Sequence, residues 1–163
     1  MEILEDWPDV DAIVVPIGGA GLISGIGLWA KAVKPGLRLV GVQPSASPPV
    51  YAYLETGSTD PMPIAPTLAD GVAGNVERTS ITWKLTRQLV DEIVLVDEDE
   101  IADGMRWALE VPHLLLEGGA VLGVAALRSG RLEALADRRV AVVTTGRNVA
   151  PDVLRQILEQ PSG

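Results

Sequence analysis

Short apolar runs alternate with amphipathic stretches along this chain. Runs rich in Val, Ile and Leu predict buried strands near residues 12–16, 38–43, 92–96 and 139–144. Between them, helical spacing of apolar residues predicts helices over residues 22–33, 50–55, 80–89, 98–116, 120–128 and 151–158. This alternation is typical of βαβ units, whose right-handed crossovers place helices on both faces of a parallel sheet. The sequence therefore predicts an α/β fold, with residues 1–163 as a single domain.

Capping and breaking residues mark the ends of several predicted helices. Pro35 and Gly36 stop the helix over residues 22–33. Asp97 is placed to cap the helix that starts at residue 98, with Glu100 as its capping-box partner. Pro151 stands in the first turn of the last helix, where proline is tolerated because that N–H is unpaired in any case.

Composition narrows the classes of function. The chain has 163 residues, is 47% hydrophobic and contains no Phe, so its core must be aliphatic. A net charge of -9 without a basic patch argues against nucleic-acid or anionic-membrane partners. No cysteine and no apolar run of transmembrane length are present, and we expect a cytoplasmic protein. Residues 1–8 have the pattern of a helix end, which favours a chain that continues further upstream.

A glycine-rich segment follows the first predicted strand and carries the strongest chemical signal. Residues 16–25 read PIGGAGLISG. Glycines let the backbone turn sharply, so that several N–H groups point into one small space at the positive end of the following helix. Such a loop suits a phosphate, although a tight connection that binds nothing is the alternative. It has neither the lysine of a Walker loop nor the G-x-G-x-x-G spacing of a dinucleotide site.

Five ordered segments of the chain resemble one family. They are the glycine loop (GGAGLISG, residues 18–25), VGVQPS (40–45), TLADGV (67–72), LLEGGA (115–120) and VTTGRNV (143–149). Together they resemble the threonine dehydratase, serine dehydratase and serine racemase group of fold-type II pyridoxal phosphate (PLP) enzymes. The resemblance implies a Rossmann-like, tryptophan synthase β-like large domain, present here in incomplete form, and PLP as the cofactor.

The resemblance also implies which residues contact the cofactor. The amides of Gly18, Gly19, Ala20, Gly21 and Leu22 would hold the PLP phosphate, with Ala20 at a position where the family usually has glycine.

Three further residues are implied on the side of the cofactor ring. Thr145 falls where family members use Ser to hydrogen-bond the pyridine nitrogen, and a neutral hydroxyl there suits β-elimination better than transamination. Gly71 and Glu117 would line the ring side of the site, although a solvent-facing carboxylate at a helix end is the alternative for Glu117.

The lysine on which the family's chemistry depends has no counterpart in this sequence. The resemblance places it in an N-terminal half of the fold that this chain does not match. The lysines present, at positions 31, 34 and 84, have the spacing of surface residues. We therefore assign no catalytic residue, and expect the chain to be most of the large PLP-binding domain and inactive alone.

We expect no metal site. Gln43 stands where some racemase-like members have a coordinating Glu, and an amide is a weaker ligand for a hard cation. No carboxylate follows at residues 47–49. His113, the single histidine, is expected to have a structural or surface role.

The resulting hypothesis is the PLP-binding part of a threonine/serine dehydratase-type enzyme, which eliminates water from L-Thr or L-Ser to give a 2-oxoacid and ammonia. The alternatives are a non-catalytic domain or remnant that keeps the phosphate-binding fold, a serine racemase-type activity in the full-length protein, and a nucleotide-binding module. The last is disfavoured because Gln43 stands where a ribose-binding carboxylate would be. The expected partners are an amino-acid substrate in the complete enzyme and a second copy of the chain, through homodimerisation or self-association.

Overall fold

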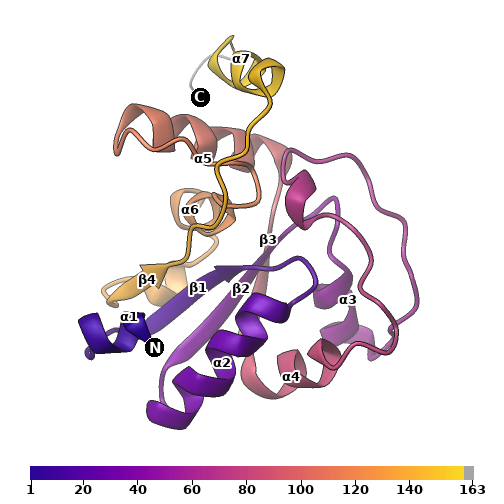
Figure 1. The fold of residues 1–163 in the computed structure, drawn as a ribbon, viewed down its shortest axis with the longest axis vertical. Coiled ribbons are helices and arrows are strands. Elements are labelled where there is room, and N and C mark those ends of the chain that lie inside the picture. Colours follow the sequence, from indigo (N-terminus) through magenta and orange to yellow (C-terminus); the bar gives the residue numbers. More distant parts are fainter. Residues whose placement is uncertain (160–163) are drawn as a thin grey trace.

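The computed structural model describes residues 1–159 and contains a four-stranded sheet in the order β3-β2-β1-β4 (Figure 1). All neighbouring strands pair in parallel. Their bounds are β1 Ala12–Pro16, β2 Arg38–Pro44, β3 Glu92–Val96 and β4 Val140–Val142. The predicted α/β class and parallel sheet are thus confirmed, and three of the four strands lie within one residue of their predicted bounds.

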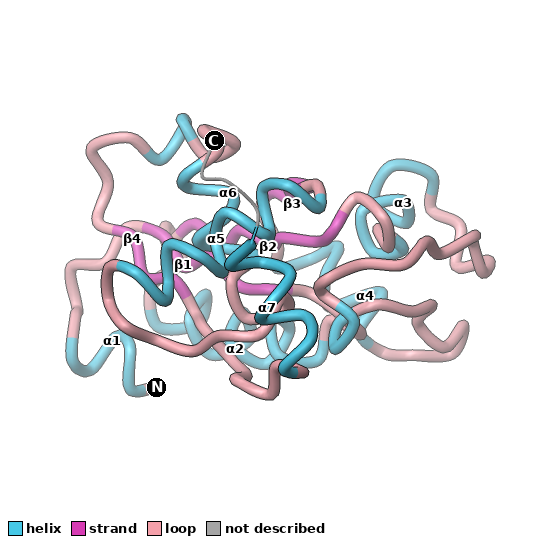
Figure 2. Tube along the Cα trace, turned by 90° about the horizontal axis from the view of Figure 1, so that it is seen from above, coloured by secondary structure: helices cyan, strands magenta, loops and turns pink. Residues whose placement is uncertain are grey.

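Helices cover both faces of the sheet, which is the arrangement predicted from the sequence (Figure 1). The helices and short 3-10 turns are α1 Glu2–Asp6, α2 Gly21–Val33, α3 Pro49–Thr56, η1 Asp70–Val72, α4 Thr82–Leu89, α5 Glu98–Glu110, α6 Leu122–Arg128, η2 Glu133–Leu135 and α7 Pro151–Glu159. One hydrophobic cluster joins the sheet to α1, α2, α3 and α4, and a second joins it to α5, α6 and α7. In Figure 2, which looks down on the molecule from above, helices α5, α6 and α7 lie over the strands.

Strand β1 lies in the interior of the sheet, and every residue of it is buried. Its side chains alternate between the two cores: Ile13 and Val15 pack with the α2 cluster, whereas Val14 packs with the α5 and α6 cluster. A strand buried on both faces needs apolar residues at consecutive positions, which explains why the run is continuous rather than alternating.

Helix α5 is shorter than predicted. It ends at Glu110 rather than near residue 116. The physical reason is Pro112, which has no N–H to continue the helical hydrogen bonding, followed by His113 in the left-handed region with φ 57°. His113 is exposed and its Nδ1 lies 3.1 Å from the Leu109 carbonyl, a local contact at a helix end that agrees with the predicted structural or surface role.

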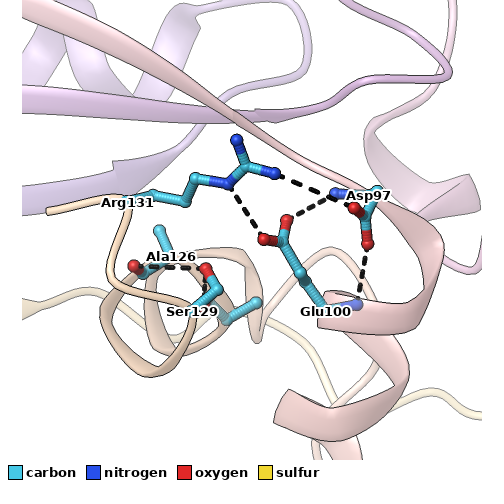
Figure 3. A network of polar contacts seen from close by, with 6 residues as sticks. Asp97, Glu100, Ala126, Ser129 and Arg131 are labelled. Carbon is cyan, nitrogen blue, oxygen red and sulfur yellow. Dashed lines mark hydrogen bonds and ion pairs between the residues drawn. The ribbon is translucent and has the colours of Figure 1, made fainter.

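The start of α5 is fixed by the predicted capping box (Figure 3). The Glu100 N–H donates to Asp97 Oδ1 at 3.0 Å, and the Asp97 N–H donates to Glu100 Oε2 at 2.8 Å. Arg131, which follows α6, donates from Nε to Glu100 Oε1 at 2.9 Å. This contact raises the pKa of the Arg131 guanidinium, and it ties the end of one helix to the start of another.

A second ion pair joins the first and last strands of the sequence. Arg139, just before β4, donates from Nε to Asp11 Oδ2 at 3.1 Å and from Nη2 to Asp11 Oδ1 at 3.1 Å. The side-chain hydrogen bonds from Arg139 lower the pKa of Asp11 from 3.8 to about 2.

Within the described part of the chain, none of the helices combines the length and the apolar character that a membrane span requires.

Candidate functional site

Two turns leave the same edge of the sheet side by side. β1 and β4 pair in parallel, with Val14 opposite Val142, so the segments after them emerge from neighbouring carboxyl ends. The Val143 N–H continues the pairing by donating to the Val14 carbonyl at 2.9 Å. Ligands of open parallel sheets bind beyond the carboxyl ends of the strands, and this edge carries both the glycine loop and the turn with Thr145.

The glycine loop has the backbone geometry of an anion site. Ala20 is the N-cap of α2 and adopts the left-handed conformation, with φ 60° and ψ 10°. Within residues 1–159, the N–H groups of residues 18 to 22 donate no hydrogen bond to the protein; the first paired amide is that of Ser24, which donates to the Ala20 carbonyl at 3.1 Å. Unpaired amides at the positive end of a 13-residue helix favour a bound phosphate.

Space for a ligand is present beside the loop. A Cβ built on Gly19 or Gly21 would have no heavy atom within 4 Å, whereas one on Gly18 would lie 3.2 Å from the Cα of Val72 in η1. The backbone is therefore tightly packed at Gly18 and open at Gly19 and Gly21. Ser24 lies in the first turn of α2, where its N–H donates to the Ala20 carbonyl; its side chain is buried, and its Oγ has no hydrogen-bond partner within the described residues.

Glu117 lies where three segments meet. Its N–H donates to the Gly146 carbonyl at 3.1 Å, and its Oε2 accepts a hydrogen bond from the Asn148 N–H at 3.1 Å. The Glu117 carboxylate packs directly on Gly146, where a Cβ would overlap it, and a Cβ on Gly71 would lie 3.4 Å from Glu117 Oε1. The half-buried carboxylate thus joins the turn after β4 to η1.

A cleft of about 620 Å³ lies next to Glu117, between the segment before η1, the start of α5, and α7. Its charged lining residues are all acidic: Asp70, Glu98, Asp99 and Glu117. No residue of the glycine loop lines it. A phosphate would be repelled by these carboxylates, so the charge of the cleft disfavours an anion there.

The predicted site residues are brought to one edge of the sheet. Residues 18 to 22 form the loop itself, with Leu22 exposed at the start of α2. Gly71 lies near the Glu117 carboxylate, and the exposed Thr145 directly precedes the Gly146 that Glu117 packs against.

The sequence alone assigned no role to Ser24, Val72, Gly146 or Asn148, although each lies in one of the five segments that resemble the family. No local sequence pattern could have predicted the roles of Gly146 and Asn148, because their contacts with Glu117 join segments about 30 residues apart.

The three lysines have other partners or face solvent. Lys31 forms an ion pair with Asp91 at 2.6 Å, and Lys34 donates to the carbonyls of Pro8 at 2.9 Å and Val10 at 2.7 Å. Lys84 is exposed on α4. Lys31 and Lys34 are half-buried rather than freely exposed, because these contacts hold them against the protein.

Gln43 is fully buried at the end of β2, and its amide is occupied by protein groups. Oε1 accepts from the Tyr51 N–H at 2.9 Å, and Nε2 donates to the Ile17 carbonyl at 3.4 Å. Both ends of the side chain therefore link β2 to the neighbouring backbone. The prediction that this position holds no metal stays a prediction.

Comparison with known proteins assigns the chain to a family. Residues 1–146 match the family described as "Pyridoxal-phosphate dependent enzyme". The chain belongs to the PLP-dependent enzyme family. Among curated relatives, it is 38% identical over 160 residues to the L-threonine ammonia-lyase of Thermotoga maritima, covering 98% of this chain and 39% of that protein. It is also 38% identical over 159 residues to the catabolic L-threonine dehydratase TdcB of Escherichia coli, covering 96% of this chain and 48% of that protein.

Solved structures of the PLP-dependent family show the same fold. The maize serine racemase matches with a TM-score of 0.86 and 32% identity, over 96% of this chain and 49% of that one. Threonine deaminase isoform 2 of Solanum lycopersicum matches with a TM-score of 0.88 and 26% identity, over 97% of this chain and 46% of that one. The resemblance to fold-type II enzymes and the tryptophan synthase β-like fold are confirmed. The chain spans less than half the length of each of these four relatives.

Proposed function

We propose that this chain is the phosphate-holding part of a threonine/serine dehydratase-type enzyme, which eliminates water from L-Thr or L-Ser to give a 2-oxoacid and ammonia. The observation that carries the proposal is the set of unpaired amides at residues 18 to 22, next to open space at Gly19 and Gly21. The 38% identity to L-threonine ammonia-lyase and dehydratase over nearly the whole chain supports the reaction class.

The residues of the glycine loop fit the phosphate of PLP. The unpaired amides supply donors, the left-handed Ala20 turns them toward the start of α2, and the side-chain-free positions 19 and 21 leave room for the phosphate oxygens. The buried Ser24 hydroxyl, which lacks a protein partner in the described chain, is a further polar group next to the loop. When bound, PLP would supply the electron sink that makes the α-proton of an amino acid removable.

The roles of the chain's own residues are binding and orientation. The amides of residues 18 to 22 would hold the phosphate, and the Thr145 hydroxyl would offer the cofactor ring a neutral hydrogen-bonding group. Gly71 and Glu117 shape the ring side of the site. Proton removal is assigned to no residue of this chain, because none of its three lysines stands at the site (Lys31 and Lys34 are engaged elsewhere, and Lys84 is exposed).

A substitution at Gly19 tests the proposal. Since a side chain at Gly19 meets no protein atom, Gly19→Asp should leave the fold intact and place a carboxylate in the phosphate site. At about 4 Å and an effective dielectric constant of about 20, one pair of like charges repels by about 4 kcal/mol before screening by salt. We expect PLP and inorganic phosphate to bind at least about 100-fold more weakly, as measured by titration calorimetry.

Gly19→Asn is the matched control, because it has the same shape without the charge. It should weaken binding much less than Gly19→Asp. Equal binding of PLP by wild type and Gly19→Asp would place the phosphate elsewhere and overturn the proposal.

A serine racemase-type activity of the complete protein is the second candidate, supported by the 32% identity to the rice and maize serine racemases. In either case we propose an amino-acid substrate and a self-associating or homodimeric state. Supporting the latter, an apolar groove of about 380 Å³ between α1 and α2 is lined by Leu22, Ile26 and Trp29. Sedimentation over a range of concentrations would reveal a monomer if this expectation is wrong.

A further inference from the structure

We propose that Glu117 is a positioning residue, whose carboxylate holds the turn after β4 so that Thr145 faces the cofactor. The inference rests on the proposed function and goes beyond it, because it assigns the carboxylate to the protein backbone and not to the cofactor. The Glu117 bridge is defined here as the contacts of Glu117 with Gly146 and Asn148.

The first support is that a single residue, Glu117, forms hydrogen bonds with two backbone groups of the turn. The Glu117 backbone N–H donates to the Gly146 carbonyl at 3.1 Å, and Glu117 Oε2 accepts from the Asn148 N–H at 3.1 Å. Two backbone groups of the turn, one acceptor and one donor, are thus bound by the same residue. Residues 143–150 form neither helix nor strand, so the turn has little other regular hydrogen bonding to hold it.

The second support is steric. The Glu117 carboxylate lies so close to the Cα of Gly146 that any side chain at that position would overlap it. Glycine at residue 146 therefore makes room for the carboxylate itself. The turn that leads into α6 also fixes Glu117, since the Glu117 carbonyl accepts from the N–H groups of Ala120 at 2.9 Å and of Val121, the N-cap of α6, at 3.2 Å.

The third support is the absence of a competing charge. Within residues 1–159 no Lys, Arg or His forms an ion pair with Glu117. The Asn148 N–H is therefore a backbone partner for the side-chain oxygen of Glu117, and an amide oxygen in the same place could accept from it as well. Thr145 belongs to the same turn, three positions before Asn148, so contacts that fix the turn also fix the direction of its hydroxyl.

Two changes break the bridge and one preserves it. Glu117→Ala removes the acceptor. Gly146→Ala keeps Glu117 itself, but the new methyl group pushes its carboxylate out of position. Glu117→Gln keeps an oxygen that accepts from the Asn148 N–H but removes the charge. If Glu117 acts through the turn, Glu117→Gln should bind PLP as wild type does. If Glu117 acts as a charge on the cofactor, Glu117→Gln should lose as much PLP affinity as Glu117→Ala.

The experiment compares PLP with inorganic phosphate on the 163-residue chain, using titration calorimetry for both. We expect Glu117→Ala and Gly146→Ala to weaken PLP by about tenfold, the worth of one well-placed hydrogen bond, and to leave phosphate binding within about twofold. Thr145→Val should cause a similar loss of PLP affinity, and combining it with Glu117→Ala should add little, because both act through one contact. Amide hydrogen exchange at Asn148 should be faster in Glu117→Ala and unchanged in Glu117→Gln.

The outcomes distinguish the positioning role of Glu117 from the proposed function. If wild type binds neither PLP nor phosphate, the proposed function fails, while the Asn148 exchange rates still test the bridge. If wild type binds both and Glu117→Ala weakens neither, or if Glu117→Gln loses as much as Glu117→Ala, the positioning role is wrong and the proposed function stands. Should Glu117→Ala not fold, Gly146→Ala carries the same comparison.

Discussion

Two glycines of α2 should respond in opposite ways to the same substitution. A Cβ on Gly25 meets no atom within 4 Å, whereas a Cβ on Gly27 would lie 2.7 Å from Leu39 Cδ2 and 3.1 Å from Leu89 Cβ. Leu39 is fully buried on β2, so its side chain can give way only by repacking the core around it. Alanine is favoured over glycine inside a helix by about 1 kcal/mol at either position, so the difference between the two variants isolates the packing of α2 against the sheet.

The expected magnitudes follow from these contacts. Gly25→Ala should raise the free energy of unfolding by about 0.5–1 kcal/mol. Gly27→Ala gains the same helix preference but overpacks the core, which costs about 1–3 kcal/mol, so it should be neutral or destabilising by up to about 2 kcal/mol. The two variants should therefore differ by about 1–3 kcal/mol, or roughly 2–12 °C in melting temperature for a chain of this size.

Urea unfolding followed by circular dichroism measures this difference, provided that the m-value is unchanged. A third variant tests the assigned cause. Leu39→Ala opens space beneath Gly27, so it should destabilise the Gly27→Ala background less than wild type, with a coupling above about 0.5 kcal/mol. Gly25→Ala and Gly27→Ala unfolding at the same urea concentration would refute the close approach of α2 to β2.

Two further predictions concern acid stability and catalysis. Because Arg139 lowers the folded-state pKa of Asp11 to about 2, below its ordinary value of 3.8, ionised Asp11 stabilises the fold above about pH 4, and this contribution disappears as the pH falls toward 2. Asp11→Asn should thus be less stable than wild type at pH 6 and equal to it near pH 2 in urea titrations; a deficit that persists at the lower pH would contradict the ion pair as its cause. The chain mixed with PLP and L-Thr or L-Ser should yield no more 2-oxoacid than free PLP does; a borohydride-reducible PLP adduct at one lysine, with 2-oxoacid above that control, would prove this expectation wrong.

Much of the fold could be predicted from the sequence because its signals are local. The run AIVVP needs only its own residues to specify a buried strand, and Asp97 and Glu100 specify the start of α5 through two hydrogen bonds within one turn. One error arose where a neighbouring strand sets the length: β4 was predicted over residues 139–144, but its pairs with β1 cover only Val140–Val142. The error in the length of α5 was local, since Pro112 stands in the sequence just after the last helical residue.

The site was only partly predictable. The resemblance placed Glu117 at the ring side, yet its partners Gly146 and Asn148 lie far along the chain, and a contact of that kind leaves no pattern in either segment. The resemblance likewise marked Ala20 as a departure from glycine. Only the structure shows that Ala20 adopts a left-handed backbone, which costs an alanine about 1–2 kcal/mol.

The position of β4 beside β1 has a consequence for how the chain folds. Arg139 and Asp11, which flank these strands, are 128 residues apart in sequence, whereas β1 and β2 are separated by a single helix. Closing a loop of that length costs about 4 kcal/mol in chain entropy, before a constant common to all loops, and each halving of the loop saves about 0.6 kcal/mol. The pairing of β1 with β2 and of β2 with β3 should therefore form first. The edge that presents both the glycine loop and Thr145 is then completed last, so the order of folding delays assembly of the binding site until nearly the whole chain is in place.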